Sequence, residues 1–263
     1  MLRSVFTKTL RDHRRTLPVW AVATAAVAAM YASFYPQVSG GAMRDMVANF
    51  PQALRDAFHL DDLSSAAGYL QSTTFGLLVP LLIVGYGITT GTRAIAGDEE
   101  AGHLDVLLTH PVSRTRLLLH RFAALAVGCA GIGAVVFLAM LVIRGSAQLD
   151  TIAIGGFAAQ SVNAALLGIV FGALAMMLGA LTGRRGRVLG VSAALAILAY
   201  AANTFAVQLG ADWTRALSPF RYYIGGEPLK NGIQWADAGV LAGATGILIA
   251  VAAASFTRRD LTT

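Results

Sequence analysis

Long apolar runs separated by shorter polar segments dominate the pattern of this 263-residue chain. A helix needs roughly 20 consecutive apolar residues to cross the hydrocarbon core of a bilayer. Runs of that kind, free of Asp, Glu, Lys, Arg and His, lie at 17–35, 71–92, 122–143, 152–181, 188–209 and 238–257. The pattern therefore predicts an all-α membrane protein with six transmembrane helices, which form a single transmembrane domain over residues 1–263.

One charged segment, at 93–121, separates the second run from the third. It carries an acidic cluster at 98–100 and several basic residues, so it is expected to lie outside the hydrocarbon. Behind the acidic cluster, Leu104, Leu107 and Leu108 recur at i, i+3 and i+4 and give one apolar face. This spacing predicts a short amphipathic helix, and the acidic residues suit its N-terminal end.

Two residues define how that segment turns back to the membrane. Pro111 is expected to end the first helix, because proline disfavours helical backbone at the residue before it. Ser113 is suited to N-cap a second helix that continues into the third run. The segment therefore resembles a helix–turn–helix hairpin on the membrane surface, suited to docking a partner. A hairpin that merely lies in the interface is the alternative.

Composition and charge strengthen the membrane assignment and orient it. Hydrophobic residues make up 56% of the chain and charged residues 13%, about half the charged fraction of soluble domains. With the N-terminus inside, the inner segments hold most of the basic residues: Arg3, Lys8, Arg11, Arg14, Arg15, Arg93, Arg114, Arg116, Arg121, Arg184, Arg185, Arg187, Arg258 and Arg259. The outer segments hold Arg44, Arg55, Arg144, Arg215, Arg221 and Lys230. The positive-inside rule then predicts a multi-pass plasma (inner) membrane protein with both termini cytoplasmic, and topology accounts for the net charge of +6 without nucleic acid.

The N-terminal region admits two interpretations. A basic stretch before the first apolar run is also typical of a secretory signal peptide. The run at 17–35 is longer than the apolar part of most signal peptides, however, and its removal would leave five spans. We therefore expect a retained first helix. The high content of Arg relative to Lys, with abundant Ala, favours a bacterial origin.

Residues for enzymatic chemistry are not found in recognisable patterns. The sequence has no P-loop, HExxH or G-x-S-x-G motif, and Cys129 is its single cysteine. His103, His110 and His120 share the charged segment, but Pro111 breaks the helical phase between them, so we expect solvated side chains rather than metal ligands. The sequence thus predicts no catalytic, cofactor or metal site in this chain.

Polar groups inside the runs are the candidates for a substrate path. No run contains a carboxylate, which makes an ion-driven carrier less favourable. Neutral polar side chains remain, and the candidates that we select are Thr74, Tyr86, Asn163, Tyr200 and Asn203. Hydrogen bonding between helices is the equally simple alternative for each of them.

Further local features bear on how the helices fit together. Pro80 is expected to kink the second span. The pairs Gly168–Gly172 and Gly239–Gly243 have the GxxxG spacing that allows close helix contact, although a chain with 28 glycines produces such spacings by chance. Aromatic residues before the last run predict either short re-entrant helices or an aromatic belt at the outer interface; they are Trp213, Phe220, Tyr222, Tyr223 and Trp235.

The run DEEAGHLDVLLTHPVSRTRLLLHR closely resembles the cytoplasmic segment between the second and third spans of membrane subunits of type-2 ABC exporters. The matching positions are Glu99, Gly102, Leu104, Asp105, Leu107, Leu108, Pro111, Val112, Ser113 and Arg114. His103 stands where the family usually has a small hydroxyl residue. SPFRYYIGGEPLKNG, at 218–232, is more weakly similar to the segment before the last span.

This resemblance implies a permease subunit that exports a hydrophobic or amphipathic substrate, such as a drug, lipid or peptide, at the expense of ATP. It implies a partner ATPase subunit that holds the ATP and Mg²⁺, and a second permease subunit that is either identical or a sister chain. The ATPase contacts that it implies are Glu99, Glu100, Gly102, Leu104, Asp105, Leu107, Leu108, Pro111 and Arg114. An ion-coupled secondary transporter and a membrane-embedded enzyme are the alternatives.

Overall fold

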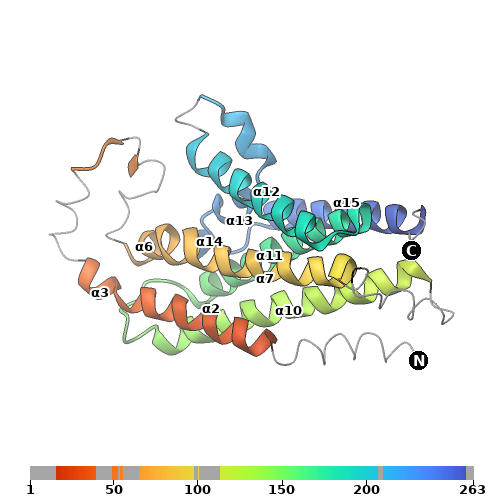
Figure 1. Cartoon of the computed structure of the whole chain (residues 1–263). Coiled ribbons are helices and arrows are strands. Elements are labelled where there is room, and N and C mark those ends of the chain that lie inside the picture. The colour runs from red at the N-terminus through yellow and green to blue at the C-terminus, as the bar shows by residue number, and fades with distance from the viewer. Residues whose placement is uncertain are drawn as a thin grey trace.

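A computed structural model describes residues 16–39, 49–52, 54–55, 65–97, 100, 113–206 and 210–258. All the regular elements within these ranges are helices, drawn in Figure 1. They are α2 (Thr16–Ser33), α3 (Tyr35–Val38), α6 (Ala66–Ser72), the π-helix η2 (Thr74–Leu78), α7 (Val79–Thr92), the π-helix η3 (Arg93–Gly97), α10 (Arg114–Ile143), α11 (Ile154–Thr182), α12 (Arg185–Phe205), the 3-10 helix η4 (Asp212–Leu217), α13 (Pro219–Ile224), α14 (Pro228–Asn231) and α15 (Trp235–Arg258).

The prediction of six spans is confirmed. The helices long and apolar enough to cross a membrane lie at Thr16–Val38, Ala66–Gly97, Arg114–Ile143, Ile154–Thr182, Arg185–Phe205 and Trp235–Thr257. Successive spans run in opposite directions, so α2 begins and α15 ends at the same end of the bundle (Figure 1). We call this the basic end, because Arg93, Arg114, Arg121, Arg184 and Arg185 lie there, and we call the other end, with residues 210–234, the far end.

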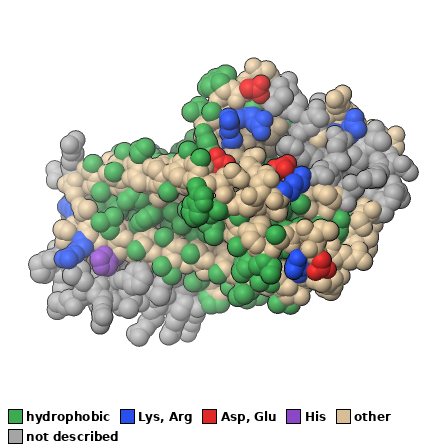
Figure 2. Space-filling view, turned by 180° about the vertical axis from the view of Figure 1, so that it is seen from behind, with side chains coloured by type: hydrophobic (Ala, Val, Ile, Leu, Met, Phe, Trp, Pro, Cys, Tyr) green, Lys and Arg blue, Asp and Glu red, His purple; other side chains and the backbone are tan. Residues whose placement is uncertain are grey.

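Hydrophobic side chains cover the flank of the bundle, as expected of a surface that faces lipid. Figure 2 shows them spread along its length, with basic side chains at one end and further charged side chains over the other half. Large apolar residues such as Val142 (83% exposed) and Ile197 (69% exposed) remain open to the surroundings. In water such an apolar surface would be unfavourable, so it is consistent with membrane insertion.

Helix α11 forms the centre of the bundle. In its most apolar stretch 67% of the residues are buried, against 22% for α12, and it packs against α7, α10, α12 and α15. Its closest approach is to α7, where the pair Gly168–Gly172 faces a second GxxxG pair, Gly87–Gly91. A Cβ atom at Gly87 would overlap the carbonyl oxygen of Gly168, and one at Gly91 would overlap that of Gly172. Small residues thus allow the two backbones to touch.

The other GxxxG pair has no such role within the chain. Nothing lies within 4 Å of a Cβ built on Gly239 or Gly243, because both are on the exposed side of α15. Of the two spacings seen in the sequence, the structure therefore uses Gly168–Gly172 for packing in this chain.

Around Pro80, where the sequence predicts a kink, the second span departs from α-helical hydrogen bonding. The span widens into the π-helix η2 immediately before the proline, and the N–H of Val79 donates to Thr74 O, five residues back. A π-helical turn accommodates a proline by shifting the hydrogen-bond register around the missing N–H. A second π-helix, η3, ends this span at the basic end.

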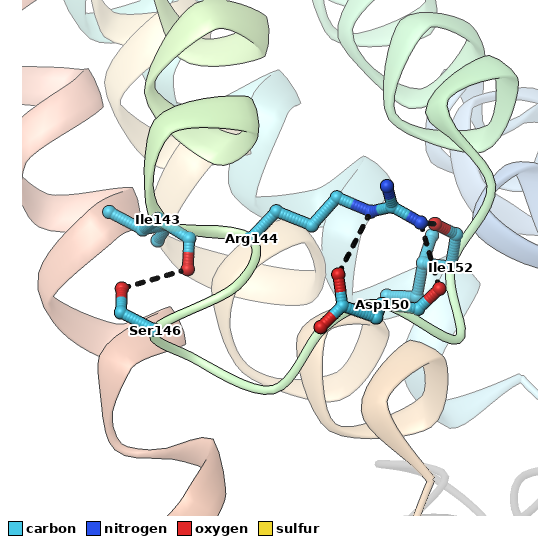
Figure 3. A network of polar contacts seen from close by, with 5 residues as sticks. All are labelled: Ile143, Arg144, Ser146, Asp150 and Ile152. Carbon is cyan, nitrogen blue, oxygen red and sulfur yellow. Dashed lines mark hydrogen bonds and ion pairs between the residues drawn. The ribbon is translucent and has the colours of Figure 1, made fainter.

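Arg144 closes the turn that joins α10 to α11 at the far end (Figure 3). Its guanidinium Nη2 donates to the carbonyl oxygens of Asp150 (2.8 Å) and Ile152 (3.0 Å), and its Nε lies 3.9 Å from the Asp150 carboxylate. Ser146 Oγ donates to Ile143 O at 3.1 Å and caps the end of α10. These contacts satisfy backbone carbonyls that no helix partner would reach.

Candidate functional site

The predicted ATPase-docking segment leaves the bundle at η3 and returns at α10, on the basic end. Its residues Glu99, Gly102, Leu104, Asp105, Leu107, Leu108 and Pro111 lie outside the described residues, so the amphipathic helix and the turn at Pro111 stay predictions. The structure does describe Glu100 and Arg114, the candidates near the two ends of the segment. The second helix begins at Arg114 as expected, although the Ser113 side chain makes no capping hydrogen bond.

Glu100 contacts the start of the fifth span. Its carboxylate Oε1 accepts a hydrogen bond of 2.8 Å from the backbone N–H of Arg185, the first residue of α12. The first N–H groups of a helix have no partner within it, and the helix dipole favours a negative charge there. Glu100 therefore joins the charged segment to α12, in addition to any contact with a partner protein.

Arg114 contacts the end of the sixth span. Its Nη1 donates to the carbonyl oxygen of Phe256 at 3.2 Å, and its guanidinium lies 5.9 Å from the centre of the Phe256 ring. The carbonyl lies near the C-terminal end of α15, where a cation is favoured, and the ring adds a cation–π contact. Arg114 therefore anchors the return of the segment to α15.

Arg121, which the sequence interpretation treated only as an inner basic residue, makes the third link. It is 6% exposed and its Nη1 donates to the carbonyl oxygen of Ala94 in η3. Carbonyl groups at the end of a π-helix lack donors within the helix, and a buried guanidinium requires acceptors. The hydrogen bond from Arg121 to Ala94 O therefore satisfies both groups. The available indication in the sequence was an arginine directly before the apolar run at 122–143.

The far end contains a polar seat for the short helix α13. The side-chain Nδ2 of Asn163 (α11) donates to Tyr223 O, and Nε2 of Gln71 (α6) donates to Ile224 O, each at 3.2 Å. The hydroxyl of Tyr223 donates to the carbonyl oxygen of Phe75 in η2 at 2.8 Å. We call Gln71, Asn163 and the Phe75 carbonyl the seat of α13.

The orientation of both seat amides follows from these bonds. A carbonyl oxygen only accepts, so the NH₂ groups of Gln71 and Asn163 must point at α13 and their oxygen atoms point elsewhere. Gln71 Oε1 and Asn163 Oδ1 are buried and have no hydrogen-bond partner within the described part of the chain. The same holds for Thr74 Oγ1, one residue before Phe75. The seat thus has acceptor capacity that α13 does not use.

The predicted path residues divide between this region and the packed core. Asn163 belongs to the seat, and Thr74 adjoins it in sequence. Tyr200 (α12) packs edge-to-face on Phe220 of α13, with ring centres 5.4 Å apart. Tyr86 lies instead between α2 and α10: its ring meets Trp20 edge-to-face at 6.1 Å, and its hydroxyl fills the space left by the missing side chain of Gly128.

Asn203 is half-buried near the end of α12, and its Oδ1 has no partner among the described residues. No contact brings Asn203 or Tyr86 to the seat. Gln71 and Tyr223, by contrast, are not among the path residues predicted from the sequence, in which Tyr223 is named as one of the aromatic residues before the last run. The fold brings Gln71 to the residue after Tyr223, through its hydrogen bond to Ile224 O.

The aromatic residues before the last span follow both alternatives that the sequence left open. Phe220 and Tyr223 are buried at 5% and 1% exposure in α13, which enters the bundle as a re-entrant helix does. Trp213 and Trp235 are 71% and 77% exposed, as expected of side chains at a membrane interface. Within the described residues, no group of His, Cys, Asp and Glu side chains could hold a metal ion.

Comparison with known proteins identifies the family. No protein in the curated collection matches this sequence. A family model described as "ABC-2 family transporter protein" matches residues 3–261, nearly the whole chain, and agrees with the six apolar helices and with the motif that precedes α10. The chain therefore belongs to the ABC-2 transporter family, in which it is a membrane-spanning permease subunit.

Proposed function

We propose that this permease forms the membrane part of an ATP-driven exporter of a hydrophobic or amphipathic substrate, such as a drug, lipid or peptide. A partner ATPase subunit binds ATP and Mg²⁺ and docks on the segment at 98–112, and a second permease subunit completes the complex. The basic end then faces the cytoplasm of a bacterial cell, and the far end faces outward.

The observation that carries this proposal is the set of contacts around the docking segment. Its flanks are joined to the second span through Arg121 and Ala94, to the fifth through Glu100 and Arg185, and to the sixth through Arg114 and Phe256. A force applied to this segment would therefore reach three spans directly. Such a connection is what a permease needs if ATP hydrolysis in a separate subunit is to move its helices.

A neutral amphipathic substrate fits the polar groups within the bundle. The seat and the neighbouring Thr74 offer unpaired neutral oxygen atoms, and the described parts of the span interiors carry no carboxylate beyond Asp237 in the first turn of α15. Coupling to protons commonly uses a carboxylate or histidine inside the membrane. This favours an exporter driven by a partner's ATP hydrolysis over an ion-coupled carrier.

Co-purification with the ATPase subunit tests the proposal. Leu107→Asp places a charge on the apolar face of the predicted docking helix, and a loss of roughly 3 kcal/mol at the interface would weaken association about two decades. We expect Leu107→Asp to abolish co-purification and transport-coupled ATP hydrolysis at unchanged membrane expression.

Val106→Asp provides the matched control, because position 106 lies on the opposite face of the same predicted helix. It should retain complex formation. If Leu107→Asp keeps full association and stimulated hydrolysis, or if Val106→Asp is equally damaging, the docking assignment is wrong.

A further inference from the structure

Helix α13 is held in the bundle by a carbonyl group that the second span cannot satisfy by itself. In η2, Val79 N–H donates to Thr74 O, five residues back. In the same register the next carbonyl, Phe75 O, requires an N–H at position 80, and Pro80 has none. The Tyr223 hydroxyl supplies this missing donor from α13, at 2.8 Å.

Changing η2 to α-helical register would move the unsatisfied carbonyl. With hydrogen bonds four residues apart, Phe75 O accepts from Val79 N–H, and Pro80 now leaves Gly76 O without a donor. Neighbouring carbonyls on a helix point in directions about 100° apart, because a turn takes 3.6 residues. The acceptor would then no longer face Tyr223, while Phe75 O would have a partner within its own helix.

Other contacts also hold α13, among them a hydrogen bond of 2.7 Å from Oγ of its N-cap, Ser218, to the carbonyl oxygen of Ala199 in α12. Two amide–carbonyl bonds of 3.2 Å, from Asn163 and Gln71, hold its C-terminal end, and Phe220 lies between Phe171 and Tyr200 at ring distances of 5.6 and 5.4 Å. Asn163 and the rings of Phe171 and Tyr200 lie on α11 and α12, whereas Gln71 lies in α6, directly before η2. The Tyr223–Phe75 bond is the described hydrogen bond of α13 to a carbonyl group of η2 itself.

We propose that α13 is a gate at the far end of the substrate path, and that Tyr223 is a positioning residue that locks the gate to the π-helical turn before Pro80. This inference rests on the proposed function, since a gate presupposes a path. A change of η2 from π to α register releases the lock. The second span runs continuously from η2 to η3, where the docking segment begins, so movement at the basic end has a covalent route to the lock.

A double-mutant cycle tests the lock. The variants are Tyr223→Phe, Pro80→Ala and their combination, each in a Cys129→Ala background with Ile224→Cys as a reporter on α13. The purified full-length permease is placed in lipid nanodiscs, and the rate at which a water-soluble maleimide labels the reporter measures how often α13 leaves its seat.

Tyr223→Phe removes one buried hydrogen bond, so labelling should become about fivefold faster, which corresponds to about 1 kcal/mol. Pro80→Ala restores the N–H that the Phe75 carbonyl lacks in π register and that the Gly76 carbonyl lacks in α register. It should therefore also accelerate labelling, even with Tyr223 intact. In the Pro80→Ala background, adding Tyr223→Phe should change the rate little, because the carbonyl is already satisfied.

Tyr222→Phe is the matched control. It removes the same hydroxyl from the neighbouring residue of α13, where that hydroxyl donates to the exposed carbonyl of Ala216 at 2.8 Å. Its labelling rate should equal that of the parent. The lock is refuted if Tyr222→Phe and Tyr223→Phe act alike, if Tyr223→Phe has the same effect in both backgrounds, or if Pro80→Ala alone leaves the rate unchanged.

These readouts need no ATPase, so the lock and the proposed function can fail separately. Co-purification of the ATPase with Tyr223→Phe should be unchanged, because α13 lies at the end of the bundle away from the docking segment. Loss of that association in Tyr223→Phe would show a general structural defect and would overturn the positioning role.

Discussion

Single glycine positions determine how closely the central helices of this permease approach. A Cβ at Gly87 would overlap the backbone of α11, and one at Gly168 would meet Ile83 and Cys129, whereas nothing lies within 4 Å of a Cβ at Gly239. Gly168–Gly172 and Gly239–Gly243 have the same GxxxG spacing, so the spacing alone could not show which pair packs against another helix. The distinction comes from which helix face meets a neighbour.

Substitution at these glycines gives a direct residue-scale prediction. Gly87→Val would force α7 away from α11 because its Cβ overlaps the Gly168 carbonyl, and overpacking of this kind costs typically 1–3 kcal/mol. Gly239→Val, on the exposed side of α15, should stay within about 0.5 kcal/mol of the parent.

Thermal unfolding of the two detergent-purified variants provides the measurement. The melting temperature should fall clearly for Gly87→Val and stay near the parent for Gly239→Val. Equal losses in both variants would contradict the view that the α7–α11 contact is the tighter of the two helix surfaces.

At the scale of whole elements, the apolar pattern predicted the spans because length and hydropathy alone decide which helices cross a bilayer. The predicted run at 188–209 and the observed α12 (Arg185–Phe205) differ by a few residues at each end. Helix α13 could not be predicted with equal certainty, since six residues give too short a pattern. Its place depends on Asn163 and Gln71, which lie far away in the sequence.

The π-helix before Pro80 shows a similar limit. The sequence indicated that the proline would disturb the second span, but the form of the disturbance depends on what satisfies the freed carbonyl. In this structure that partner is the hydroxyl of Tyr223, on another helix. The docking segment is a different case, because a family motif predicted it and the described residues reach only its two flanks.

The Glu100–Arg185 contact leads to a prediction about the start of α12. Glu100→Lys would place a positive charge where the helix end favours a negative one, and loss of such a cap costs about 1 kcal/mol. Hydrogen exchange of the amides at 185–188 should then accelerate about fivefold, since 1.4 kcal/mol corresponds to a factor of ten.

Glu100→Gln is the control for that experiment. The amide keeps an oxygen acceptor at the same position and should preserve most of the protection at Arg185. If Glu100→Lys leaves exchange at 185–188 unchanged, Glu100 does not cap α12, and its role would be restricted to contacts outside this chain.

At the scale of the whole molecule, the alternating direction of successive spans leads to a testable prediction about its orientation in the membrane. Arg185 and Lys230 are both exposed but lie at opposite ends of the bundle, the first at the start of α12 and the second in α14. By the positive-inside rule, the excess of basic residues at the first of these ends predicts that this end faces the cytoplasm. The two positions should therefore be reached by reagents from opposite sides of the membrane.

Single cysteines introduced in a Cys129→Ala background test this orientation. Cys129 is completely buried, so its replacement removes the native thiol without changing the surface. In intact cells a membrane-impermeant maleimide should label Lys230→Cys and leave Arg185→Cys unlabelled, because charged reagents do not cross the hydrocarbon. After permeabilisation both should label, which shows that each thiol is reactive. Labelling of Arg185→Cys from outside the intact cell would reverse the topology and place the docking segment on the side of the membrane that has no ATP.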